Sequence, residues 1–289
     1  MISVDKKYFL ILITTLFIIV FSSCSFSQNS LNEQLNTQFK LAKELYNREE
    51  YFDAITELKR LLFFDKKNEY TYSANELIGK CYKMGAKFAD AIQYFVLAEL
   101  HSSDNEQIFN SKIEIIKINI LRRTISRALV LLDSLEADDR FINKNNEMIY
   151  WRGWAYIFDD KWDYAAEEFN KINSGRELKR ISEEVESERY SVLKAKIFSF
   201  IIPGAGQFYT GNFINGILSL GWNLLWGYIT VNAFIENRAL DGIAVGELLW
   251  LRFYRGNVQN AEKFAEEKNR EISNKTLEYL QADYKGEKP

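Results

Sequence analysis

Apolar and polar positions follow three different patterns along the chain. From residue 32 to residue 175, apolar residues recur with helical spacing, three or four positions apart. From Ile197 to Ile235 no charged residue occurs, although 27% of the whole chain is charged. Charged residues then return, and residues 258–289 have the pattern of a charged, amphipathic C-terminal helix. Only two prolines occur in 289 residues, so the sequence predicts an all-α fold.

The helical pattern of residues 32–175 repeats with a constant period. Alanines stand at 54, 91, 128 and 165, which are 37 residues apart. A bulky residue lies three positions before and four positions after each alanine. Twelve positions before the alanines stand Ala42, Gly79, Ile116 and Gly153. Small residues let two helices approach closely while large ones fill the space beside them, so the pattern predicts four helix pairs.

This pattern resembles the tetratricopeptide repeat, which combines small, aromatic and alanine positions in the same order. The usual period of that repeat is about 34 residues, so the longer period implies longer turns or helices. The third repeat departs from the family pattern, with Ile116 and Asn119 at two key positions. The resemblance implies an α-solenoid whose concave face binds a protein or a peptide.

The resemblance also implies which residues face a ligand, because the first helix of each pair lines the concave side. A row of lysines could hold a peptide carboxylate or an acidic segment. The alternative is that these lysines only keep a helix face soluble. In the fourth repeat the equivalent residues are large and apolar, and form either a groove or a surface that the next helix covers. The candidate peptide-binding residues are Lys43, Tyr46, Lys80, Lys83, Lys117 and Trp154.

Residues 176–196 are predicted to form a charged helix that caps the repeats and connects them to the next region. Leu178, Ile181 and Val185 give this helix one apolar face. Residues 197–235 could extend about 58 Å as a helix, whereas one membrane crossing takes about 30 Å. The sequence therefore predicts a membrane-associated hairpin within residues 197–257, with two crossings or one crossing and a re-entrant turn.

A glycine-rich motif lies in this uncharged segment, and its residues are Pro203, Gly204, Gly206, Gln207, Tyr209, Gly211 and Gly216. The motif resembles the TM2-like hairpin of PGxGQ-type bacterial envelope proteins of uncharacterised function. The resemblance covers residues 195 to 260 and implies membrane localisation, not an activity. A phosphate-binding loop would need a later Gly and Lys, so we expect no nucleotide and no other cofactor.

The N-terminus has the pattern of a secretory signal, residues 1–27. Lys6 and Lys7 precede an apolar run, and small residues follow it. The segment before Cys24 resembles a bacterial lipobox, which implies lipidation of Cys24. Ordinary cleavage near residues 27–28 and an uncleaved anchor are the alternatives. All three export the repeats, which places them in the bacterial envelope, on the periplasmic side.

The sequence offers no set of residues for catalysis or metal binding. There is one histidine, His101, and Cys81 lies in an apolar helical stretch. A net charge of −3 argues against nucleic-acid binding. We therefore expect a non-enzymatic envelope scaffold with a protein or peptide partner. The alternative is an accessory factor for membrane-protein assembly or transport, in which the hairpin itself binds a membrane partner.

Overall fold

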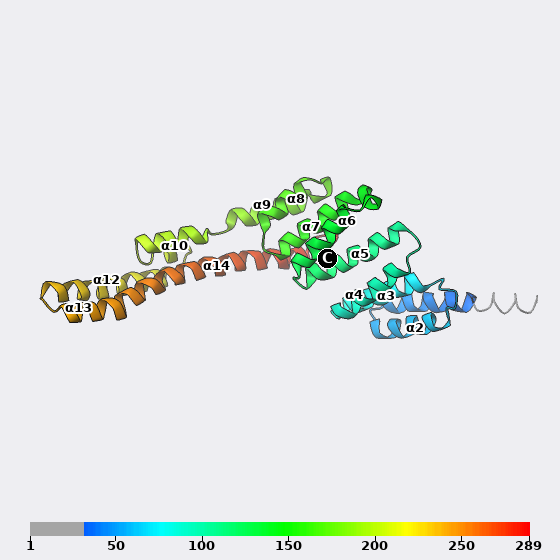
Figure 1. Cartoon of the computed structure of the whole chain (residues 1–289), viewed down its shortest axis with the longest axis horizontal. Helices are drawn as coiled ribbons and strands as arrows, with labels where there is room; N and C mark the ends of the chain where they lie inside the picture. The colour runs from blue at the N-terminus through cyan, green and yellow to red at the C-terminus, as the bar shows by residue number, and fades with distance from the viewer. Residues whose placement is uncertain (1–31) are drawn as a thin grey trace, which may run out of the picture. The chain divides into compact units, whose positions relative to one another are not determined.

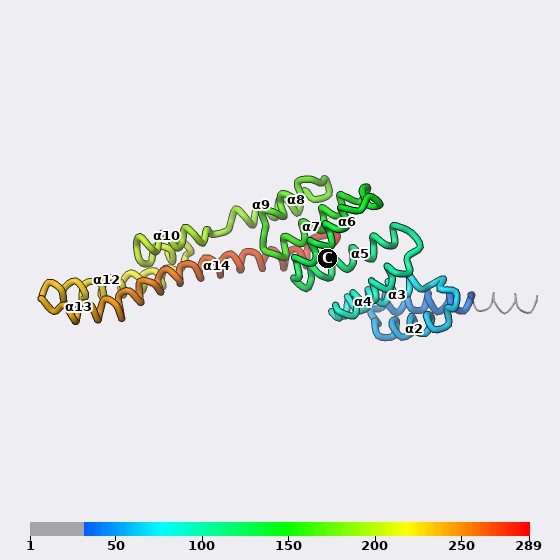
Figure 2. The backbone as a smooth tube through the Cα atoms, in the orientation of Figure 1, coloured from blue at the N-terminus to red at the C-terminus, as the bar shows by residue number. Residues whose placement is uncertain are grey.

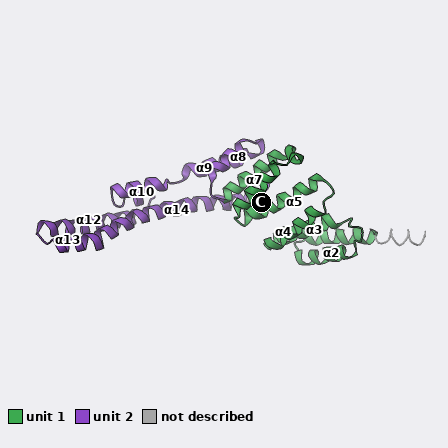
Figure 3. Ribbon diagram, viewed as in Figure 1, with its two compact units in different colours: residues 1–158, 289 green, residues 159–288 purple. Residues whose placement is uncertain are grey.

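The structure, a computed structural model, describes residues 32–289, and within this range every regular element is a helix (Figure 1). The all-α prediction is confirmed for this part of the chain. The chain divides into two compact units, residues 1–158 with residue 289 and residues 159–288 (Figure 3). The predicted signal segment and Cys24 lie outside the described residues.

Unit 1 is a succession of helices in which each helix from α2 to α6 packs on the next (Figure 1). A helix over residues 32–47 comes first. The others are α2 (Tyr51–Phe64), α3 (Thr71–Met84), α4 (Phe88–Leu100), α5 (Asn105–Leu121), α6 (Ile125–Glu136), the 3-10 turn η1 (Asp139–Lys144) and α7 (Asn145–Phe158).

The repeated small residues lie where two helices of a pair meet. Ala54, Ala91 and Ala128 are fully buried in the first turns of α2, α4 and α6. A Cβ atom on Gly79 would come within 3.0 Å of the Phe95 ring, so a side chain there would push α3 and α4 apart. The predicted helix pairs of unit 1 are therefore present, and their small residues are needed for close packing.

The turn inside each helix pair is also repeated, at a position the sequence pattern did not single out. Residues 49, 86, 123 and 160 each have a left-handed backbone, with φ of 64°, 55°, 56° and 60°. In the first three turns, the N–H of the residue after the left-handed one donates to a carbonyl near the end of the preceding helix. These bonds are Glu50 to Leu45, Lys87 to Tyr82 and Thr124 to Asn119, each at 2.9 Å. Each bond satisfies a carbonyl at the helix end, as in a Schellman motif. None of the four residues is glycine, the residue that favours this conformation.

Unit 2 is built along one long helix, α14 (Leu251–Ala282), which packs against α9, α10, α11 and α12 (Figures 1 and 2). The elements before it are α8 (Trp162–Asn170), the 3-10 turn η2 (Asn173–Gly175), α9 (Arg176–Glu188), α10 (Val192–Ile201), α11 (Ala205–Tyr209), α12 (Phe213–Ile235), α13 (Ala239–Val245) and the π-helical turn η3 (Gly246–Trp250).

The arrangement of unit 2 differs from the predicted linear order of domains. The division between the units falls inside the fourth predicted repeat, so α8 is grouped with the C-terminal helices. Residues 258–289 are not a separate tail, because most of them continue α14 and pack on α9 and α10. In the predicted connecting helix, Leu178, Ile181 and Val185 are buried, as their spacing indicated.

The predicted membrane crossings are not confirmed. Within residues 32–289 no helix combines the length and the apolar content that a crossing requires. The 23-residue α12 is the longest uncharged helix, but Asn215, Asn223 and Asn232 interrupt its apolar sequence. The hairpin also pairs differently from the prediction, because α12 packs on α13 and η3, while α10 packs on α14.

Candidate functional surfaces

The lysines predicted to line the concave face of unit 1 already have partners within the chain. Lys80 forms an ion pair with Glu76 at 2.6 Å. Glu114, on α5, pairs with Lys83 at 3.0 Å and with Lys117 at 2.8 Å. Burial opposes the ionisation of Glu114, but the charges of Lys83 and Lys117 outweigh it and hold the pKa of Glu114 below its usual value. A peptide carboxylate would have to compete with these pairs.

The other candidate peptide-binding residues pack against aromatic rings or are buried. The Lys43 ammonium lies 4.8 Å from the centre of the Phe39 ring, and Tyr46 packs against the core around Leu58. Trp154 is only 2% exposed, so it does not line an open groove. Lys117 lies 4.4 Å above the Trp151 ring. The structure thus brings Lys83 and Lys117 together through Glu114, and leaves Lys43 apart from them.

The glycine-rich motif lies at the centre of unit 2, where it is held by Asn257 of α14. The left-handed Gly204 follows Pro203 in the turn after α10, and its N–H donates to Asn257 Oδ1 at 2.8 Å. Gln207 donates from Nε2 to the Asn257 carbonyl at 2.9 Å, and Asn257 donates from Nδ2 to the Ser199 carbonyl at 2.8 Å. Gln207 is 1% exposed and Asn257 is 2% exposed. These uncharged groups satisfy one another inside the protein, as buried polar groups must.

Two glycines of the motif allow close packing, one against a backbone carbonyl and the other against an aromatic ring. A Cβ on Gly206 would lie 2.2 Å from the Ala195 carbonyl oxygen and 2.7 Å from Ala261 Cβ. A Cβ on Gly216 would lie 2.7 Å from the Phe208 ring. Gly211 is left-handed with open space around it, so its role is conformational. The small residues of the motif therefore allow α10, α11 and α12 to pack closely on one another and on α14.

Tyr209 connects the motif to the start of α10. Its hydroxyl accepts a hydrogen bond from the Ser191 N–H at 3.1 Å. Further along α14, Asn269 donates to the Tyr190 carbonyl at 2.9 Å and accepts from the Tyr190 N–H at 2.8 Å. These bonds fix the link between α9 and α10 on α14.

Sequence reasoning missed the residues of α14 that receive the motif. The signal was available, because small or amide side chains recur every four positions in a helix otherwise rich in charge. These residues are buried along one seam, and they are Asn257, Ala261, Ala265, Asn269 and Ser273.

A second polar cluster connects the start of α8 and the end of α9 to α14 through hydrogen bonds to Asp160. Asp160 receives two hydrogen bonds from the Arg189 guanidinium, at 2.8 and 3.0 Å, and one from Ser273 Oγ at 2.6 Å. Trp162 Nε1 also donates to Asp160, at 2.9 Å. Burial alone would raise the pKa of Asp160, but the bonds from Arg189, Ser273 and Trp162 together lower it.

The outward faces of α10 and α12 are apolar, whereas several polar side chains are buried beneath them. On α10 and α12 many large apolar side chains are exposed, while Ser199 and Asn223 of these helices and Gln207 of α11 are buried. This is the reverse of the usual pattern of a water-soluble fold, and exposed apolar surface of this kind is typical of interaction sites. The exposed apolar residues include Leu193, Ile197, Phe200, Ile201, Phe213, Ile214, Ile217, Leu218, Leu224, Tyr228, Val231 and Ile235.

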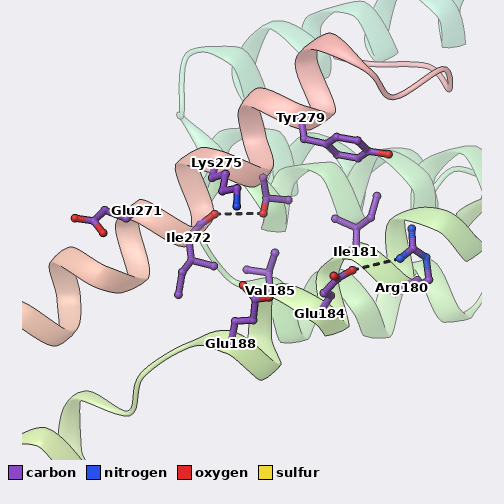
Figure 4. A pocket seen from close by; sticks show the side chains of 10 residues that line it. Arg180, Ile181, Glu184, Val185, Glu188, Glu271, Ile272, Lys275 and Tyr279 are labelled. Atoms are coloured by element: carbon purple, nitrogen blue, oxygen red, sulfur yellow. Dashed lines mark hydrogen bonds and ion pairs between the residues drawn. The ribbon is translucent and has the colours of Figure 1, made fainter. Parts of the chain in front are cut away.

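A hollow of about 490 Å³ lies between α9 and α14 (Figure 4). Ile181, Val185 and Ile272 form its apolar part, and Glu184 at its edge pairs with Arg180 at 3.3 Å. No group of three or more His, Cys, Asp or Glu residues is placed to hold a metal ion in residues 32–289.

Comparisons with known proteins add one structural likeness. No family model matches the sequence, and no curated protein matches it. Among solved structures, the chain is similar to a tetratricopeptide repeat protein from Parabacteroides merdae ATCC 43184, with 15% identity and a TM-score of 0.42. That comparison covers 84% of this chain and 98% of the other.

Proposed function

We propose that the chain is a non-enzymatic scaffold of the bacterial envelope, in which the helical repeats bind a protein partner and unit 2 attaches the repeats to a lipid layer. The repeats support the first part, because stacked helix pairs present extended binding surfaces. The outward apolar side chains of α10 and α12 around a polar interior support the second, and this is the observation that carries the proposal. The exposed apolar side chains extend along both α10 and α12. A lipid layer covers apolar surface of this kind without needing specific polar contacts.

The attachment is tested with the full-length chain and phospholipid vesicles, by flotation in a density gradient. Three exposed residues on α12 are replaced together: Ile214→Glu, Ile217→Glu and Leu224→Glu. The variant should float less than the native chain, because each carboxylate opposes transfer of α12 into lipid. The matched control carries Val96→Glu, Val130→Glu and Ile142→Glu, which replace exposed apolar residues of unit 1 and should leave flotation unchanged. Equal flotation of the two variants would refute the attachment.

Export places the repeats in the periplasm in this proposal. Residues 1–31 lie outside the described residues, so the support is the signal pattern of the sequence. The intact mass of the mature chain distinguishes a lipidated Cys24 from cleavage near residues 27–28. A full-length mass in the envelope fraction would favour the uncleaved anchor.

The alternative function, an accessory factor whose hairpin binds a membrane protein, makes a different prediction for the α12 variant. Cross-linking in detergent solution, without a lipid layer, would recover the protein partner of the scaffold from both the native chain and the variant. Loss of that partner from the α12 variant alone would favour the alternative.

A further inference from the structure

Helix α10 separates its residues into an outer apolar face and an inner small-residue face. Leu193, Ile197, Phe200 and Ile201 are 66%, 45%, 64% and 69% exposed. At 100° per residue they fall within an arc of about 100°. Ala195 and Ser199, on the opposite side, are fully buried against α14. Apart from the Phe200 ring, whose centre lies 6.0 Å from that of the Tyr254 ring of α14, the outer face of α10 is largely exposed.

Two lysines border this apolar face, one on each side. From the centre of the apolar arc, Lys194 lies about 70° in one direction and Lys196 about 90° in the other. Lys196 Nζ pairs with Glu262 of α14 at 3.0 Å, and both side chains stay partly exposed. Lys194 makes no ion pair with any residue in the part of the chain that the structure describes. Lysines at such borders lay their methylene stems along apolar surface and keep their ammonium groups in water.

The position of Lys194 is not explained by the stability of α10. Ser191 caps the helix by accepting from the Lys194 N–H, so Lys194 lies in the first helical turn. A positive charge there is unfavourable, because the helix dipole is positive at that end. A negatively charged partner outside the chain would relieve this repulsion.

We propose that α10 lies in the plane of a lipid–water boundary, where Lys194 and Lys196 bind the phosphate groups of anionic phospholipids. This inference rests on the proposed attachment to lipid and specifies its chemistry. The apolar face of α10 enters the acyl region, and the lysines reach the headgroups on either side of it. Lys194 contributes more than Lys196, because Glu262 already neutralises part of the Lys196 charge.

The test compares the full-length chain on vesicles of phosphatidylcholine alone and on vesicles that also contain phosphatidylglycerol. Native protein should prefer the anionic vesicles, and added salt should weaken that preference. The contribution of a lysine near an anionic surface corresponds to about a five-fold change in affinity. We expect Lys194→Gln to lose about that factor on anionic vesicles and the double variant with Lys196→Gln to lose more. Binding of both variants to neutral vesicles should not change.

The control is Lys263→Gln, which replaces an exposed lysine of α14 paired with Glu267, and it should bind like the native chain. If native protein binds neutral and anionic vesicles equally and the glutamine variants match it, the inference about α10 is wrong while lipid attachment stands. If native protein binds neither kind of vesicle, the proposed attachment itself is wrong. If Lys263→Gln loses as much affinity for anionic vesicles as Lys194→Gln, the loss follows from the net charge of the protein and not from the position of Lys194. That result would also overturn the inference.

Discussion

The side chain of Gln207 donates to the backbone carbonyl of Asn257 at 2.9 Å, across 50 residues of the chain. The amide of Asn257 accepts from Gly204 N–H and from Ser219 Oγ, both at 2.8 Å, and donates to the Ser199 carbonyl. One asparagine thus connects the end of α10, the motif turn and α12 to α14. Because these groups are buried, the loss of any one partner leaves another without a hydrogen bond.

The first prediction concerns the isosteric change Asn257→Asp. Asp accepts the same bonds at Oδ1, but at neutral pH its second oxygen faces the Ser199 carbonyl, where Asn257 donates. We expect a loss of about 3 kcal/mol or more in the free energy of unfolding of unit 2, measured by urea titration with tryptophan fluorescence. At low pH the protonated carboxyl regains a donor, so the loss should shrink. Asn260→Asp, on the exposed face of the same helix, is the control and should cost little at either pH.

The second prediction compares Gly206, which allows two helices to pack closely, with Gly221, which has open space around it and only lowers the helix propensity of α12. Gly206→Ala places a methyl group 2.2 Å from the Ala195 carbonyl oxygen, so α10 has to move away from α11. We expect a loss of about 3 kcal/mol, or failure of unit 2 to fold. Gly221→Ala, inside α12 with open space around it, should instead gain about 1 kcal/mol from helix propensity. Thermal unfolding followed by circular dichroism measures both, and equal effects would contradict the packing role of Gly206.

The third prediction concerns the repeated left-handed turn of unit 1. Ala86 has φ of 55°, a conformation that costs an L residue about 1–2 kcal/mol. Ala86→Gly should therefore raise the free energy of unfolding of unit 1 by about 1 kcal/mol, although glycine also adds freedom to the unfolded chain. Ala137 follows α6 with an ordinary φ of −76°, and Ala137→Gly should not stabilise. If both glycine variants are less stable than the native protein in urea titration, the strain at residue 86 is absent.

The repeats could be predicted because their signal is local and is copied four times. The alanines at 54, 91, 128 and 165 fix which residue of each pair faces its neighbour, and all four are fully buried. The pairs Lys80–Glu76 and Lys117–Glu114 each lie within one helix, at i,i+4 and i,i+3 spacing, but the partner of Lys83 could not be predicted in the same way. Lys83 of α3 reaches Glu114 of α5 only because the fold brings these two helices together, and a row of lysines in the sequence does not show that pairing.

The motif was located by sequence, but its partners were not. Gly204, Gly206 and Gln207 were expected to lie in a membrane hairpin, whereas Gly204 and Gln207 bond to Asn257 and Gly206 packs against Ala195 and Ala261. Contacts across 50 residues leave no periodic pattern of their own. Counting charged residues also overstated the apolar character of α12, because it gives no weight to Asn215, Asn223 and Asn232. A polar amide lowers the apolar character of a helix without changing its charge.

The last prediction concerns pH and the Asp160 cluster. The pKa of Asp160 is lowered in the folded chain by its bonds to Arg189, Ser273 and Trp162, against the opposing effect of burial, while in the unfolded chain it is about 3.9. The folded state therefore binds this proton less readily, so the cluster stabilises unit 2 fully above the unfolded pKa. That contribution is lost as the pH falls through the folded pKa.

The variant Asp160→Asn has no charge at this position, so the free energy of unfolding of the variant should be lower than that of the native chain at pH 7. The difference should narrow progressively below about pH 4. Asp163→Asn, at an exposed position in the first turn of α8, is the control. Urea titrations at a series of pH values measure the difference, and a gap that stays constant into the acid range would show that the charge of Asp160 does not stabilise unit 2.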